Sequence, residues 1–534
     1  MSNDARTDLE PNQAPPFVDV DLFGADLPLQ EALKANGAAA AFGTLAAFGR
    51  HWGRPEMFEL ARVADANVPY LKDNIVTFDP AYHRFMSESM AAGLHCSTWN
   101  KEGHAVGAPA EVVRAARFYM AAQVENGHLC PITMTRASIA ALAGAPDLLA
   151  QVMPKVESRR YDPQFRPWQS KTAMTLGMGM TEKQGGTDVR TNTTRALRDG
   201  AAYRIDGQKW FMSAPMSDAF LVLAQAPNGL TCFFMPRFRP DGSVNGLHFV
   251  KLKDKLGNRS NASSEVEFQN AFALPVGEEG RGIRTILQMV QLTRLDCAIS
   301  SVGIMRAALA RAVHHARHRT VFQKKLIDQP MMRAVLADLA LDAEAALAVV
   351  MRSCRSFDLA ASDAQEAARA RILTPAIKYW VCKTAPAFVY EAMECLGGNG
   401  YVEDYVLARL YREAPVNAIW EGAGNVMALD VLRAMKSDDA RSVLDALGHE
   451  SQDCPGAADT MRRIIRALNS TDVESHARFI VEHVALIAAV AALQTSESQI
   501  AKVFSQTRLN GGRRFTYGAT LESSSRSLER MLPN

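Results

Sequence analysis

The 534-residue chain has little that would tie it to secretion or to a metal. Its eight cysteines are scattered, and no pair has the spacing of metal ligands or of a redox motif. This indicates reduced thiols and predicts a cytoplasmic protein without a metal site. Residues 1–28 are acidic and rich in proline, and they lack the basic patch and apolar core of a signal peptide. We expect them to form an extended arm.

Long apolar runs and an excess of charge are also missing. The longest purely apolar run, residues 484–493, has ten residues, whereas a membrane span needs about twenty. We therefore expect a buried helix there and no membrane association. The formal net charge of +2 selects no partner by itself, so any nucleic-acid binding has to rest on local clusters of charge.

The fingerprint of a Rossmann dinucleotide site is absent as well. Its nearest approach, residues 177–182 (GMGMTE), ends in glutamate, and no strand–helix–strand pattern surrounds it. If a dinucleotide binds, the fold that binds it is of another type.

The pattern of apolar residues changes its period twice along the chain. Residues 29–175 are rich in alanine, with apolar residues three and four apart, for example over 137–153, which predicts an N-terminal helical domain. Residues 176–285 alternate in strand fashion, with turn signals at Asp206-Gly207 and at 227–229, which predicts a small antiparallel β domain.

Helical periodicity then returns and lasts to the end of the chain. Long segments joined by short loops over residues 286–438 predict a four-helix bundle. Residues 439–534 predict a further, C-terminal helical domain. The expected fold class is therefore multidomain α+β.

The segment 417–425 (NAIWEGAGN) places one carboxylate, Glu421, between an apolar pair and two glycines. The glycines permit a sharp turn, so the carboxyl group can lie in a dry pocket, where loss of water raises its pKa toward the range of a general base. Alternatively, Glu421 occupies the first turn of a helix over 425–436, where the helix dipole favours a carboxylate.

A second candidate segment, residues 178–188 (MGMTEKQGGTD), opens the β domain. Its adjacent glycines and hydroxyl side chains can present N–H groups and oxygens to a phosphate or to the polar edge of a flavin ring. The alternative is an ordinary tight loop.

These two segments occur in order with four others: 255–260 (KLGNRS), 277–282 (GEEGRG), 293–294 (TR) and 396–401 (LGGNGY). Together they resemble the acyl-CoA dehydrogenase family over about residues 29–436. The resemblance implies an FAD-dependent oxidoreductase in which Glu421 removes the α proton of an acyl-CoA thioester. Other members place this base at the position of Thr293, which cannot serve.

The resemblance also implies residues that bind FAD, from the β domain and from the bundle. Phe211 takes a tryptophan position of the family, Met212 and Ser213 are expected to pack on the isoalloxazine ring, and Arg319 is implied to reach the FAD of a neighbouring subunit in a homotetramer. The full set is Met178, Met180, Thr181, Thr187, Phe211, Met212, Ser213, Arg319, Phe322, Gln329, Gly397, Gly398 and Asn425.

Some motifs depart from the family pattern and point to one branch. Residues 182–186 (EKQGG), 255–263 (KLGNRSNAS) and 418–422 (AIWEG), with the C-terminal extension, resemble the AidB-like branch. That branch implies association with double-stranded DNA, a link to protection from DNA alkylation and at most weak acyl-CoA dehydrogenase activity. In its limiting case, the protein binds DNA without being an enzyme and keeps FAD only as a structural ligand. The alternatives are a catabolic dehydrogenase for short or branched acyl-CoA and an acyl-CoA oxidase.

The C-terminal end carries the charge cluster that a DNA-binding hypothesis needs. Residues 501–534 contain six basic and two acidic residues. With the resemblance, this predicts sequence-independent phosphate contacts whose affinity falls with salt. The alternative is a solvated helix face or a surface that balances the acidic arm. The candidate residues are Arg433, Arg508, Arg513 and Arg514.

Overall fold

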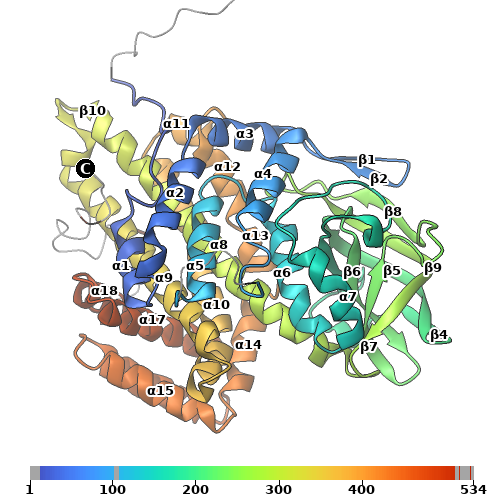
Figure 1. Ribbon diagram of the computed structural model, residues 1–534. Helices are drawn as coiled ribbons and strands as arrows, with labels where there is room; N and C mark the ends of the chain where they lie inside the picture. Colours follow the sequence, from blue (N-terminus) through green and yellow to red (C-terminus); the bar gives the residue numbers. More distant parts are fainter. Residues whose placement is uncertain (1–11, 101–106, 511–515, 518–529, 531–534) are drawn as a thin grey trace, which may run out of the picture. The chain divides into compact units, whose positions relative to one another are not determined.

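The computed structural model describes residues 12–100, 107–510, 516–517 and 530 (Figure 1). The chain divides into two compact units. The helical unit consists of Met1–Phe58, Ala105–Val124 and Cys297–Asn534, and the sheet unit consists of Glu59–His104 and Glu125–Asp296. The N-terminal helical region therefore contributes to both units.

A seven-stranded sheet forms the core of the sheet unit, with strand order β3-β6-β4-β5-β9-β7 and with β8 paired to β9. The predicted hairpin at 227–229 is confirmed, because Ala226 of β6 pairs with Gly229 of β7. The strands are β3 Leu176–Gly179, β4 Arg195–Asp199, β5 Ala202–Ser213, β6 Ala219–Ala226, β7 Gly229–Pro236, β8 Leu247–Leu252 and β9 Ser263–Val276.

Two expectations for this sheet need correction. Asp206 and Gly207 make no turn: β5 continues through them, and its register with β9 shifts between Ile205 and Gly207, as at a β-bulge. The sheet is also not purely antiparallel, because β3 and β4 both pair with β6 in parallel.

Helices and a small hairpin complete the sheet unit. The helical pattern over 137–153 belongs to two helices, since the chain breaks at Gly144 and Ala145 before Pro146 starts the next helix. Helix α6 lies beside β3 (Figure 1). The hairpin of β1 and β2 was not predicted, although its Asp73-Asn74 turn has the positive φ angles that favour such residues. The elements are β1 Tyr70–Lys72, β2 Ile75–Thr77, α4 Pro80–Ala91, α6 Leu129–Leu142 and α7 Pro146–Val156.

The helical region predicted over residues 286–438 is confirmed. Helix α10 packs against α9, α14 and α17 in the helical unit. The helices are α8 Gly282–His318, whose first part falls in the sheet unit, α9 Pro330–Leu359, α10 Ala364–Glu394, α11 Gly398–Tyr401, α12 Val406–Glu413, α13 Val416–Ile419 and α14 Gly424–Ala434.

Further helices lie before the bundle in sequence. Asp26 caps the first of them, because its carboxylate accepts a hydrogen bond of 3.1 Å from the backbone N–H of Leu29. Both α1 and α5 pack against α9. Their bounds are α1 Leu27–Ala35, α2 Phe42–Trp52, α3 Pro55–Ala66, which continues into the sheet unit, and α5 Ala110–Ala122.

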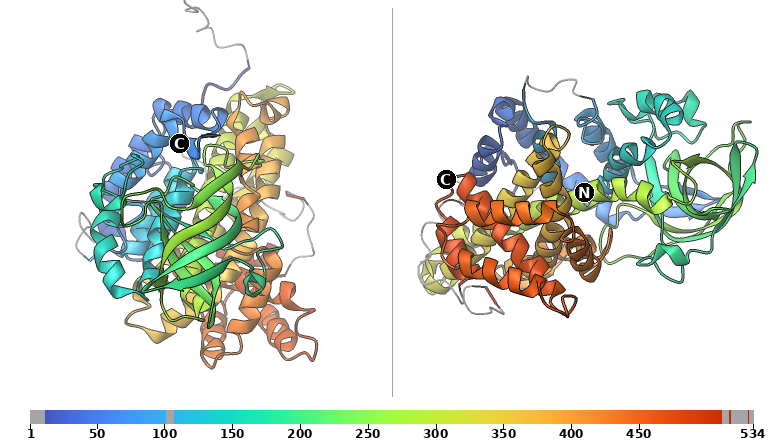
Figure 2. Two further views of the ribbon diagram at one scale, coloured as in Figure 1. Left: turned by 90° about the vertical axis from the view of Figure 1, so that its right-hand side faces the viewer. Right: turned by 90° about the horizontal axis from the view of Figure 1, so that it is seen from below.

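The C-terminal region consists of separate short helices (Figure 2). Helix α17 contains the predicted buried run, and 72% of its apolar window is buried, although its length and composition would suffice to cross a membrane. It packs against α9, α10 and α14, which confirms a core helix. The helices are α15 Asp439–Glu450, α16 Ala457–Leu468, α17 Ala477–Thr495 and α18 Ala501–Arg508. All eight cysteines are buried, and none of them forms a disulfide.

Candidate active site

Glu421 lies in a strained turn between α13 and α14 of the helical unit. Its φ angle is 56°, in the left-handed region, and Gly422 follows with φ of 102°. A non-glycine residue in this region costs roughly 1–2 kcal/mol, and such strain is concentrated at functional sites. Helix α14 begins only at Gly424, so the alternative that Glu421 sits in the first turn of that helix is wrong.

Side chains from the bundle hold this turn. The buried Lys378 of α10 donates a hydrogen bond of 2.8 Å to the carbonyl oxygen of Gly422. The indole N–H of Trp420 donates to Asn417 Oδ1 at 3.0 Å, and Asn417 Nδ2 donates to Ser300 Oγ at 3.2 Å. The backbone on both sides of Glu421 is therefore fixed, while its side chain remains half-buried.

The glycines of the turn lie close to neighbouring side chains. A Cβ atom on Gly422 would lie 2.6 Å from Met427 Cε, and one on Gly424 would lie 3.3 Å from a ring carbon of Tyr379. Asn425, a candidate for FAD, is exposed and accepts a hydrogen bond of 2.8 Å from Arg478 Nε. Thr293 cannot replace Glu421: its hydroxyl donates to the Val290 carbonyl of its own helix at 3.0 Å.

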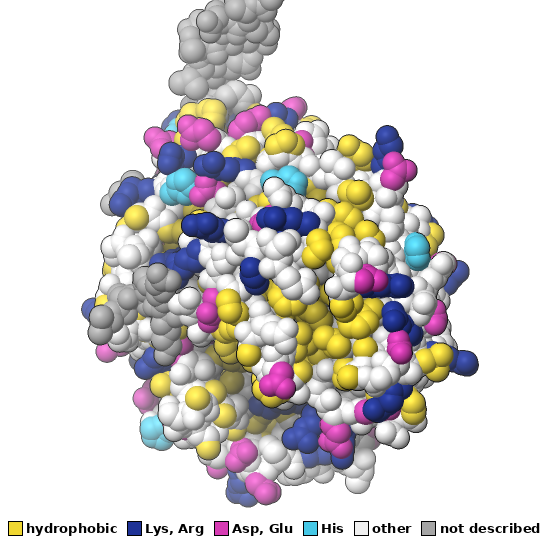
Figure 3. All heavy atoms as spheres, turned by 45° about the vertical axis from the view of Figure 1, so that its right-hand side comes forward, with side chains coloured by type: hydrophobic (Ala, Val, Ile, Leu, Met, Phe, Trp, Pro, Cys, Tyr) yellow, Lys and Arg dark blue, Asp and Glu magenta, His cyan; other side chains and the backbone are white. Residues whose placement is uncertain are grey.

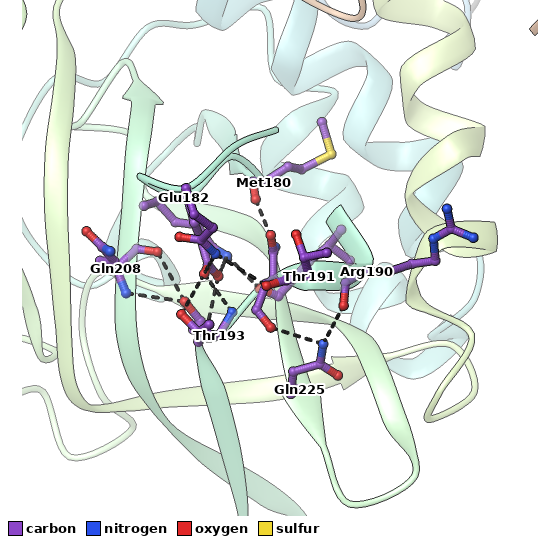
Figure 4. Close-up of polar contacts among 12 residues, drawn as sticks. Met180, Glu182, Arg190, Thr191, Thr193, Gln208 and Gln225 are labelled. Carbon is purple, nitrogen blue, oxygen red and sulfur yellow. Dashed lines mark hydrogen bonds and ion pairs between the residues drawn. The ribbon is translucent and has the colours of Figure 1, made fainter. Parts of the chain in front are cut away.

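In the sheet unit, polar contacts around Glu182 organise the candidate segment after β3 (Figure 4). Glu182 Oε1 lies 2.8 Å from Lys209 Nζ of β5, and both side chains are fully buried. Glu182 also accepts hydrogen bonds from the backbone N–H groups of Thr193 at 2.7 Å and Thr194 at 3.2 Å. Burial opposes the charge of Glu182, but Lys209 and these donors outweigh it and lower its pKa to about 2.

Other contacts hold the predicted flavin-binding residues on either side of Glu182. Asn192 Nδ2 donates to the Met180 carbonyl at 3.0 Å, and Thr181 packs where a Cβ on Gly186 would lie 2.4 Å from its hydroxyl oxygen. Met178 on β3 and Thr181 are half-buried, and Thr187 is exposed. The segment is thus a braced loop rather than a loose one. The sequence alone gives no signal that Glu182 and Lys209 pair, because they are 27 positions apart.

Strand β5 offers one aromatic ring to the surface. Phe211 is 51% exposed, and the ammonium group of Lys253 lies 4.8 Å from its ring centre. Met212 is fully buried, because the alternation of the strand turns it to the covered face, and its side chain is therefore not available to pack on a flavin. Ser213 is half-buried, and its hydroxyl lies 2.8 Å from that of Ser263 on β9.

Arg319 stands at the base of a two-residue hairpin in the helical unit, formed by β10 Thr320–Val321 and β11 Lys324–Lys325. Phe322 and Gln323 at its tip have φ angles of 49° and 66°, and Phe322 is 90% exposed. Gln329 Nε2 donates to the Val321 carbonyl at 2.9 Å and braces the hairpin. Gly397, with φ of 61°, caps the start of α11, and it is exposed together with Gly398, the first residue of that helix.

The C-terminal candidates for DNA contact are placed differently from one another. Arg508 is a correction: its side chain is 5% exposed and pairs with Asp338 at 2.5 Å and Asp342 at 2.9 Å, so it attaches α18 to α9 and is not free for a phosphate. Arg433 is exposed. Arg513 and Arg514 lie outside the described residues.

Exposed hydrophobic side chains also gather on one face of the molecule, with Lys, Arg, Asp and Glu around them (Figure 3). Contiguous apolar areas of this kind mark ligand or protein interaction sites in soluble proteins.

Three family models match the chain in sequence. They are the adaptive response protein AidB N-terminal domain over residues 12–163, the acyl-CoA dehydrogenase middle domain over 177–271 and the acyl-CoA dehydrogenase C-terminal domain over 280–436. Together they cover most of the chain.

Individual proteins agree with these models. The putative acyl-CoA dehydrogenase AidB of Escherichia coli is 46% identical over 475 residues, covering 86% of this chain and 85% of that protein. A solved structure of Caenorhabditis elegans ACDH-11 in complex with C11-CoA has a TM-score of 0.85 at 25% identity and covers 96% of this chain and 95% of that one. A structure described as Bd2924 apo-form has a TM-score of 0.83 at 28% identity, covering 91% and 99%.

Proposed function

We propose that this chain, which belongs to the acyl-CoA dehydrogenase family as an AidB-like member, uses Glu421 as the base that removes the α proton of an acyl-CoA thioester. It is an FAD-dependent oxidoreductase, and FAD, when bound, would supply the acceptor for the hydride lost from the β carbon. The supporting observation is the strained backbone of Glu421, which Lys378 and close packing hold in place. Such preorganisation favours proton transfer.

The described residues fit FAD in two places. In the sheet unit, the exposed ring of Phe211 and the braced loop at Met180 and Thr181 suit a flavin ring and its polar edge. In the helical unit, Arg319 and the glycine turn at 397–398 suit a diphosphate, because guanidinium offers fixed charge and paired donors, and exposed glycine backbone permits close approach.

Anaerobic flavin bleaching with a panel of acyl-CoA thioesters tests this function. With any thioester that reduces the flavin, Glu421→Gln should slow the single-turnover rate by about a hundredfold or more, the usual scale for a general base. Glu394→Gln, at an exposed glutamate at the end of α10, is the matched control and should react like wild type. An unchanged rate in Glu421→Gln would place the base elsewhere.

The same assay separates the two enzymatic alternatives. Fast bleaching by one short or branched thioester, with no DNA binding, would favour a catabolic dehydrogenase. Rapid formation of hydrogen peroxide in air would favour an oxidase.

We further propose that the protein is cytoplasmic, associates with double-stranded DNA and acts in the response to DNA alkylation. Its support is the match to the adaptive response AidB N-terminal domain, together with exposed cations near the C-terminal end. Since Arg508 is paired with two aspartates in the core, we assign the phosphate contacts to Arg433 and to exposed arginines of α16. Arg513 and Arg514 remain candidates from the sequence. The α16 residues are Arg462, Arg463 and Arg466.

Salt-titrated binding to a random duplex tests this assignment. The pair Arg462→Ala and Arg466→Ala should weaken binding and reduce the slope against log salt by up to about two, since each phosphate contact contributes about 0.9. The control removes the same charge at Arg62 and Arg84, which are 62% and 59% exposed in the sheet unit. Equal affinity and slope in both double variants would remove α16 from the interface.

We also propose a homotetramer. Phe322 and Met331 are 90% and 85% exposed, and Tyr401 is 82% exposed, which is unusual for large apolar side chains of a monomer and suits a subunit contact. Sedimentation equilibrium of Phe322→Ser should show smaller species; an unchanged tetramer would exclude the hairpin tip from the contact.

A further inference from the structure

A short segment near the N-terminus connects the two elements of the helical unit that we assign to the FAD diphosphate. We call residues 12–17 the strap. Asn12 uses its side-chain amide twice on Thr320: its Nδ2 donates to the Thr320 carbonyl at 2.9 Å, and its Oδ1 accepts from the Thr320 N–H at 2.6 Å. One amide thus takes up both backbone groups of the residue that follows Arg319.

The backbone carbonyl of Asn12 then contacts Arg319 directly. Arg319 Nη1 donates to it at 2.8 Å, and no other hydrogen bond from this guanidinium reaches another described residue. One edge of the planar group is therefore held, while its remaining donors can face a phosphate.

Further along, the strap is anchored to α8 by contacts independent of Asn12. His314 Nε2 lies 2.8 Å from the Pro15 carbonyl oxygen, and the rings of Phe17 and His314 meet edge to face at 5.2 Å. The guanidinium of the buried Arg311 lies 5.1 Å from the centre of the Phe17 ring. The strap thus contacts α8 near its C-terminal end and also contacts the two residues that follow this helix.

The strap also contacts the residue that follows the glycine turn. Asn399, directly after Gly397 and Gly398, directs its Nδ2 to Gln13 Oε1 at 3.4 Å. The strap therefore links two segments that are about 80 residues apart in sequence.

We infer that the strap is part of the FAD site and that Asn12 is a positioning residue, which fixes Arg319 and the 320–325 hairpin for the diphosphate. This inference rests on the proposed assignment of Arg319 to FAD. The strap carries no charge of its own, so its effect has to pass through Arg319 rather than through a direct attraction for phosphate.

The test compares FAD affinity of Asn12→Ala, Arg319→Ala and the double variant. Asn12→Ala should raise the FAD dissociation constant about three- to tenfold, the scale of one or two lost hydrogen bonds, and it should add little in the Arg319→Ala background. Binding of riboflavin, which lacks phosphate, should be the same in Asn12→Ala and wild type. A merely structural defect would weaken both ligands and would add to the effect of Arg319→Ala.

Two controls complete the design. Asp19→Asn changes an exposed residue just beyond the strap and keeps a side chain that tolerates its φ of 56°, so FAD affinity should not change. A chain that begins at residue 12 should bind FAD like the full chain, whereas one that begins at residue 18 should bind like Asn12→Ala or more weakly.

The outcomes separate the two hypotheses. If Arg319→Ala leaves FAD affinity unchanged, the assignment of Arg319 to FAD is wrong. If Arg319→Ala weakens FAD but Asn12→Ala does not, or if the two effects simply add, only the strap inference is overturned.

Discussion

Two glutamates, each inside a motif that resembles the same family, have opposite surroundings. Glu182 is fully buried, paired to Lys209 and hydrogen-bonded by backbone donors. Glu421 is half-buried and lies in a left-handed turn, and Lys378 of the bundle donates a hydrogen bond to the carbonyl oxygen of the next residue. A glutamate that is fully buried in an ion pair, such as Glu182, stabilises the fold. A half-buried glutamate held in a strained turn, such as Glu421, is suited to act as a base.

The largest expected effect tests the bracing role of Glu182. Glu182→Ala leaves Lys209 buried without its partner, and breaking a buried pair in this way costs about 3–5 kcal/mol of unfolding free energy. Urea unfolding followed by circular dichroism would measure it. The double variant Glu182→Gln with Lys209→Met should cost less than the two single variants added together. A loss below about 1 kcal/mol in Glu182→Ala would mean that this glutamate is no brace.

The dependence of the unfolding free energy on acidic pH tests the same role of Glu182, with a smaller expected effect. Because the pKa of Glu182 is lowered to about 2 from an ordinary value of 4.5, its contribution is complete above pH 4.5 and is lost as the pH falls toward 2. The difference in unfolding free energy between wild type and Glu182→Gln should therefore shrink below pH 4.5 and stay constant from there to about pH 7, since burial lowers the pKa of Lys209 to about 8. Glu59→Gln, at an exposed pair with Arg62, is the control and should change stability little at any pH. A difference that does not depend on pH would contradict the assigned pKa.

What the sequence could predict depended on how local each signal was. The bundle helices and the 227–229 hairpin follow from short-range periodicity and turn residues, and both are confirmed. The break at Gly144, the bulge at Gly207 and the separate C-terminal helices are local features that periodicity alone did not resolve.

The missed parts of the candidate site are contacts between distant residues. Glu182 and Lys209 are 27 positions apart, and Asn12 and Arg319 are 307 apart, so neither pairing has a local pattern. Lys378 is one lysine in a long helix, with nothing nearby in sequence to mark its contact with Gly422. The prediction that Arg508 contacts DNA was wrong for a related reason: the local excess of basic residues did not indicate that this side chain is paired with Asp338 inside the core.

The smallest expected effect concerns the backbone of Glu421. Because φ is 56° there, Glu421→Gly should be more stable than Glu421→Ala by about 1 kcal/mol, the cost of a Cβ in the left-handed region. Both variants lack the carboxylate and should lose acyl-CoA-dependent flavin bleaching equally, so the comparison isolates the strain from the chemistry. At Glu182, which lies outside the left-handed region, the same pair of substitutions should show no advantage for glycine. Thermal unfolding of the four variants would measure both differences. If glycine is no better than alanine at position 421, the turn is not strained, and the contrast between the two glutamates reduces to burial alone.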